Sequence, residues 1–189
     1  MNTTMFTYNQ QLATEIGGGG QYVTKSGGYD LKVVRAQFTE NKFLELDFET
    51  RDGLKLNYVS INHTKNDGQP NDYGQKMIHA IMGCTGVQNL TCDQNGNCPE
   101  LFGKFLKAVV QRVDYTKQSG ANAGQDGYKF EFKMPASINT SQTVKELVDG
   151  SPAEAYQKYA DSVQDKDERQ SYSQTQQASN QGMNDDFAF

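Results

Sequence analysis

The sequence predicts a mainly β fold: a five-stranded antiparallel barrel with a helix between its third and fourth strands, then a short C-terminal helix and a disordered acidic tail. Three observations predict this fold. Five segments have strand-like composition or alternation, and one segment between the third and fourth of them has a helical period. From residue 164 onward the chain is dominated by Gln, Ser, Asp and Asn, which cannot form a core. The 189 residues therefore have room for one domain and a tail.

The first three predicted strands follow one another closely. They comprise residues 29–38, 42–50 and 54–63. The second strand alternates, with Leu44, Leu46 and Phe48 on one face and three acids on the other. Asp52-Gly53 is a hairpin turn signal, so the second and third strands are expected to pair.

A short helix is predicted at residues 73–82, because the apolar residues there recur with helical spacing. Asn71 or Asp72 is its expected N-cap, and Gly83 is its expected end.

Two more strands complete the predicted barrel, at residues 101–115 with a bend at Gly103, and at residues 128–134. In the last strand Phe130 and Phe132 alternate with charged residues, so both are expected in the core. The order β-β-β-α-β-β is that of the OB-fold, although a small sandwich would give the same order.

A second helix is predicted at residues 151–163, with Ser151 as cap, Pro152 at the first helical position and Glu154 completing a capping box. The predicted organisation is a flexible arm at 1–20, the OB-fold domain at 21–149, the helix at 150–163 and the tail at 164–189.

Charge is distributed unevenly along the chain. Residues 1–149 carry a net charge of −1 and residues 150–189 a net charge of −4, so the body can present a basic surface although the pI is 5.0. The three cysteines, the polar first residues and the lack of a long apolar run favour a cytoplasmic protein without a membrane span.

Aromatic and basic residues are interleaved along the predicted strands, as binding to single-stranded nucleic acid requires. In a regular strand Tyr58 would share a face with Leu54 and Leu56, so core packing is an open alternative for it. The candidate DNA-binding residues are Tyr22, Lys25, Tyr29, Lys32, Arg35, Lys55, Tyr58, Lys104, Lys107, Arg112, Tyr115, Tyr128 and Lys129.

The last residues of the sequence have the chemistry of a docking peptide. Asp185 and Asp186 precede Phe187 and Phe189, so carboxylates that can pair with Arg or Lys stand beside rings that can fill an apolar pocket. We expect other proteins to bind this tip.

Several segments resemble phage-type single-stranded DNA-binding proteins. The resemblance covers about residues 29–134 and includes Asp52-Gly53-Leu54, Asp67-Gly68, Gly86-Val87 and Gly103-Lys104. It implies that the chain binds single strands without strong sequence preference, protects them and removes their secondary structure. It also implies that the tip recruits replication or recombination proteins, and that the protein acts in the cytoplasm of an infected bacterial host. The acidic, Phe-terminated tail matches this pattern.

The sequence also bears on other functions. No HExxH, GxSxG or Walker element is present, so no enzyme is predicted. The alternating acids on one strand indicate a solvated face rather than a nuclease site. No cofactor is predicted, and zinc binding by His79, Cys84, Cys92 and Cys98 is left open. The alternative function is a β-barrel protein-interaction or virion module without a nucleic-acid role. Self-association is also left open.

Overall fold

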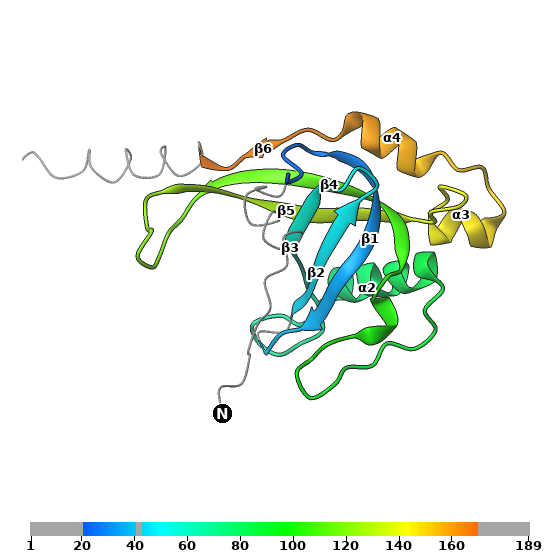
Figure 1. Ribbon diagram of the computed structural model, residues 1–189, viewed down its shortest axis with the longest axis horizontal. Helices are drawn as coiled ribbons and strands as arrows, with labels where there is room; N and C mark the ends of the chain where they lie inside the picture. The colour runs from blue at the N-terminus through cyan, green and yellow to red at the C-terminus, as the bar shows by residue number, and fades with distance from the viewer. Residues whose placement is uncertain (1–20, 41–42, 170–189) are drawn as a thin grey trace, which may run out of the picture.

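The computed structural model describes residues 21–40 and 43–169, and the fold is mainly β (Figure 1). The strands are β1 Gly27–Phe38, β2 Phe43–Thr50, β3 Lys55–Asn62, β4 Phe105–Thr116, β5 Asp126–Ala136 and β6 Lys166–Asp167. The helices are α2 Asp72–Thr85, the 3-10 helix η1 Pro99–Leu101, α3 Val144–Asp149 and α4 Ala155–Ser162.

The strands form one open mixed sheet. Strands β3-β2-β1-β4-β5 are neighbours in that order and pair antiparallel, and β6 pairs with β4 in parallel. The predicted closed barrel is wrong, because β3 and β5 come close without forming a ladder. Tyr58 on β3 has a left-handed backbone, which takes this edge out of the extended geometry that a ladder needs.

The predicted core positions are confirmed. Leu44, Leu46 and Phe48 of β2 are fully buried, and Phe130 and Phe132 of β5 are nearly so. Phe48 stacks on Phe132 with ring centroids 6.1 Å apart, so β2 and β5 meet through the core although they are not neighbours in the sheet.

Helix α2 begins where the sequence predicts and ends later. The Asn71 side chain caps it by accepting a hydrogen bond from the Gly74 amide, and Gly86 ends it in a left-handed conformation. Gly83, the predicted end, lies inside the helix against α3, where a Cβ atom would stand 2.7 Å from Val144 Cγ2. This glycine therefore allows close packing of two helices rather than ending one.

The predicted capping box at Ser151 and Glu154 is wrong. Helix α4 begins at Ala155, and the amides of Glu154 and Ala155 donate to Glu146 Oε1 at 3.0 and 2.8 Å. The capping box instead joins Thr143 and Glu146 at the start of α3. One carboxylate thus serves the first turns of two helices, which sequence spacing alone does not predict.

Residues 164–169 were predicted to begin the tail, but they lie along β4 and include β6 (Figure 1). Asp165 Oδ1 accepts a hydrogen bond from the Ser26 amide at 2.7 Å, and the Gln164 carbonyl accepts one from Gln111 Nε2 at 2.9 Å. The arm at 1–20 and the tip, with Asp185, Asp186, Phe187 and Phe189, lie outside the described residues.

The start of β4 also differs from the prediction. The chain forms η1 and a turn at Gly103, with φ of 70°, before β4 begins at Phe105. None of the helices within residues 21–40 and 43–169 is long and apolar enough to cross a membrane.

Candidate nucleic-acid interface

A tyrosine-lined groove runs between the facing edges of β3 and β5. Its first part has a volume of about 520 Å³, and its floor includes Leu56 and Phe130. The exposed or half-exposed side chains that line this part are Tyr22, Lys55, Asn57, Tyr58, Tyr115, Tyr128 and Lys129. All of them except Asn57 were among the candidate DNA-binding residues. We call this part and its continuation below the tyrosine groove.

The groove continues into a second part of about 380 Å³. The two parts share Tyr58, Lys129 and Phe130, so they adjoin one another. The second part adds Tyr73 from α2 and Lys133 from β5. Neither residue was among the candidates, because helix and strand come together here only in the folded chain.

Tyr58 is the most exposed aromatic ring in the groove, with 73% of its surface accessible. Its φ of 58° is rare for a residue with a bulky side chain and costs about 1–3 kcal/mol. The register of β2 and β3 shifts at this point. The buried positions of β3 are therefore even-numbered before the shift, at Leu56, and odd-numbered after it, at Val59 and Ile61. The core alternative for Tyr58 is therefore wrong, because the bulge turns its ring outward.

Asp47 on β2 holds the bulge in place. Its Oδ1 accepts a hydrogen bond of 2.7 Å from the Tyr58 amide, and its Oδ2 lies 3.4 Å from Arg35 Nη1. Arg35 also lies 3.3 Å from Glu45. The charge of Arg35, a predicted phosphate contact, is thus balanced by two carboxylates on the outer face of β1 and β2.

Arg112 supports the ring of Tyr128 from one side. Its guanidinium carbon lies 4.5 Å from the ring centroid, and it is fixed by Asp114 at 2.8 Å and by the Thr24 carbonyl at 2.8 Å. Tyr128 also contacts Phe130 edge to face, with centroids 6.0 Å apart, and remains half exposed. Arg112 therefore contacts a ring of the groove, and its predicted phosphate contact stays a prediction.

The chain before β1 closes one end of the groove. Tyr22 pairs in parallel with Lys55, and Val23 anchors this segment because its side chain is buried. The Val23 amide donates to the Lys55 carbonyl at 3.0 Å, and the Lys55 amide donates to the Gln21 carbonyl at 2.8 Å. These bonds fix the half-exposed Tyr22 ring at the edge of β3.

Glu131 stands between the two lysines of the β5 wall. Its carboxylate oxygens lie 2.9 Å from Lys129 Nζ and 2.7 Å from Lys133 Nζ. Burial alone would raise the pKa of Glu131, but hydrogen bonds from both lysines outweigh it and lower that pKa. The carboxylate therefore stays charged and occupies a place where a phosphate could bind the same two cations.

The remaining candidates lie outside the tyrosine groove. Lys107 is half-buried, 2.8 Å from Asp30 and over the ring of Tyr156 in α4. Tyr29 packs against the core and donates its hydroxyl to the Lys25 carbonyl at 2.8 Å. Lys25 and Lys104 are exposed, and Lys32 lines a separate cavity.

No metal site is present among the described residues, where no group of three or more His, Cys, Asp and Glu side chains could hold an ion. Cys98 is buried and Cys92 is exposed, and burial raises the pKa of the Cys84 and Cys98 thiols to about 11. These two thiols stay protonated near neutral pH, which does not favour the zinc alternative.

Comparison with protein-family models gives no match for this chain, and comparison with curated proteins gives none either.

Proposed function

We propose that this protein binds single-stranded DNA in the tyrosine groove, without strong sequence preference. The observation that carries the proposal is the set of five tyrosines that line one groove, with Tyr58 held outward by a strained backbone. Every base has a π-face, so stacking on such rings is sequence-tolerant and contributes about 1–3 kcal/mol per base. Lys55 and Lys129 lie beside the rings, where they can contact phosphates.

The arrangement of the strands supports an OB-fold of open form. Strand β1 pairs with β4 through its first half and with β2 through its second half, and α2 lies between β3 and β4 in the chain. This is the connectivity of the OB-fold, whose barrels bind oligonucleotides. In this proposal the space between β3 and β5, where a closed barrel would be sealed, is the binding groove.

The wider role follows from the resemblance to phage-type single-stranded DNA-binding proteins. The bound strand is shielded from nucleases and kept free of hairpins during phage replication or recombination. The tip with Asp185, Asp186, Phe187 and Phe189 recruits the replication proteins that need that strand. Binding is stoichiometric, so the proposal includes no catalytic step.

Intrinsic tyrosine fluorescence tests the proposal, because the chain has ten tyrosines and no tryptophan. Titration with oligo-dT is expected to quench the emission as bases stack on the groove tyrosines, and a duplex of the same length is expected to quench it much less. Phe in place of Tyr58 or Tyr128 should remove part of the quenching while keeping affinity. Absence of quenching and of binding by oligo-dT would contradict the proposal.

A further inference from the structure

A row of five exposed side chains crosses the outer face of the sheet, from the tyrosine groove to a second cavity. The strand register places Tyr22 beside Lys55, Lys55 beside Glu49, Glu49 beside Lys32, and Lys32 beside Phe105. Residues directly opposite each other on neighbouring strands project from the same face. The row therefore reads aromatic, cation, acid, cation, aromatic. We call it the cross-sheet row.

Both ends of the row present aromatic surface to solvent. Tyr22 is 49% exposed and Phe105 is 52% exposed, although each is followed in the chain by a buried residue. Burial of a phenylalanine side chain contributes about 1.5–3 kcal/mol, so a partner that covers the exposed ring of Phe105 gains from the contact. At the groove end, Tyr22 and Lys55 already line the tyrosine groove.

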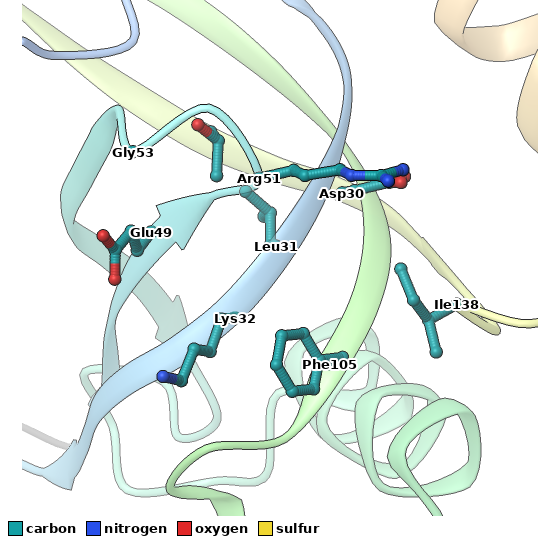
Figure 2. A pocket seen from close by; sticks show the side chains of 9 residues that line it. Asp30, Leu31, Lys32, Glu49, Arg51, Gly53, Phe105 and Ile138 are labelled. Atoms are coloured by element: carbon teal, nitrogen blue, oxygen red, sulfur yellow. The ribbon is translucent and has the colours of Figure 1, made fainter.

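The far end of the row lies in a cavity of about 580 Å³ (Figure 2). Figure 2 shows Lys32 between Glu49 and Phe105, with Ile138 on the other side of Phe105. Arg51, from the turn between β2 and β3, also lines the cavity. Asp30 lines it too, but this carboxylate is paired with Lys107 at 2.8 Å.

The chemistry of this cavity fits a strand of nucleic acid. Lys32 and Arg51 outnumber Glu49, and an exposed ring stands next to them, which are the two elements of a single-strand site. Glu49 and Lys55 are cross-strand neighbours in different cavities, so the two sites are one residue pair apart. Five neighbouring strand positions span about 19 Å, since strands lie about 4.8 Å apart.

We propose that a long single strand leaves the tyrosine groove at Tyr22, follows the cross-sheet row and stacks a further base on Phe105. This inference rests on the proposed function and extends it from one groove to a continuous path over the sheet. Lys55 and Lys32 contact phosphates along the path, and Glu49 weakens binding between them. A short oligonucleotide fills the tyrosine groove alone.

The test is the dependence of affinity on oligonucleotide length, measured by fluorescence anisotropy with labelled oligo-dT of about 4 to about 16 nucleotides. Phe105→Ala is expected to weaken binding of the longest oligonucleotide about tenfold and to leave the shortest unchanged. Lys32→Ala should make the salt slope for the longest oligonucleotide less steep by about 0.7. Glu49→Gln should strengthen its binding. Phe102→Ala, an exposed phenylalanine outside the cavity, is the matched control and should change nothing.

The outcomes separate this inference from the proposed function. The path is wrong if the wild type binds oligo-dT and both Phe105→Ala and Lys32→Ala bind the longest oligonucleotide with wild-type affinity. In that case the proposed binding in the tyrosine groove is unaffected. Equal weakening at every length would also overturn the path. A peptide of residues 180–189 that binds the wild type but not Phe105→Ala, with DNA binding unchanged, would assign the cavity to an acidic peptide instead. If the wild type binds no oligo-dT, the proposed function itself fails.

Discussion

Tyr58 combines a strained backbone with an exposed ring. Its left-handed backbone places the ring in solvent at the centre of the groove, and its amide is held by Asp47 at 2.7 Å. Strained backbone of this kind persists only when surrounding contacts fix it, and it is frequent at binding sites. Substitution of the ring and of the carboxylate that holds it should therefore have separate effects.

Tyr58→Gly is expected to raise the free energy of unfolding by about 1 kcal/mol, because relief of strain exceeds the entropic cost of glycine. The same change should weaken oligo-dT binding by roughly 5- to 150-fold, since one stacking ring is lost. Urea unfolding and anisotropy measure the two effects. Tyr58→Phe keeps ring and strain, so it should match the wild type in both; a glycine variant that binds equally well would exclude Tyr58 as a stacking residue.

Asp47→Ala is expected to weaken oligo-dT binding several-fold, because the bulge loses the acceptor of the Tyr58 amide. Glu45→Ala is the matched control, since it removes a carboxylate beside the same Arg35 but none that contacts Tyr58. Both variants lose one negative charge on β2, so electrostatic effects on DNA binding are similar. Equal affinity of the two variants would show that Asp47 does not position the ring.

At the scale of elements, the sequence predicted most of the architecture and missed the details that shape the groove. Alternation in β2 and β5 identified the core positions, and the helical spacing before Gly83 identified α2. The bulge at Tyr58 could have been suspected, because the apolar positions of β3 change parity between Leu56 and Val59. The approach of β3 and β5 depends on tertiary contacts, so no local pattern predicted the groove between them.

The carboxylate of Glu146 joins the first turns of α3 and α4. Backbone hydrogen bonds from Ala155, Thr143 and Glu154 lower the pKa of Glu146 to about 2, from its ordinary value of 4.5. The ionised form is favoured in the folded state, so this stabilisation is present above pH 4.5 and is lost as the pH falls toward 2.

Glu146→Gln should therefore be less stable than the wild type at neutral pH and should lose less stability between pH 4.5 and pH 2. Thermal unfolding followed by circular dichroism across this range measures the difference. Glu154→Gln is the control, because the side chain of Glu154 caps neither helix. Parallel pH profiles for Glu146→Gln and the wild type would contradict the capping role.

For the whole molecule, the chain separates a near-neutral body from an acidic C-terminal region. The structure moves the boundary between them, because residues 164–169 belong to the body through β6 and the contact of Asp165 with Ser26. The sequence could not show this, since Lys166 and Asp167 are a polar pair in a polar stretch. Truncations on either side of this segment should therefore behave differently.

Truncation after Arg169 is expected to keep the fold, to keep or raise affinity for DNA through the loss of two acidic side chains, and to abolish recruitment of partners. Truncation after Val163 removes β6 as well and should lower the melting temperature. Differential scanning calorimetry and anisotropy distinguish these variants. Loss of DNA binding in the first truncation would contradict the proposed division of roles.

Anisotropy of labelled oligo-dT tests whether a single strand occupies the tyrosine groove. The wild type, the double variant Tyr58→Ala/Tyr128→Ala and a duplex control are compared at about 50 mM and about 200 mM salt. We predict that the wild type binds the single strand in preference to the duplex, with a salt slope of about −2 for Lys55, Lys129 and Lys133. The folded double variant should bind at least about tenfold more weakly. Equal affinity of the two proteins, or a preference of the wild type for the duplex, would contradict the account.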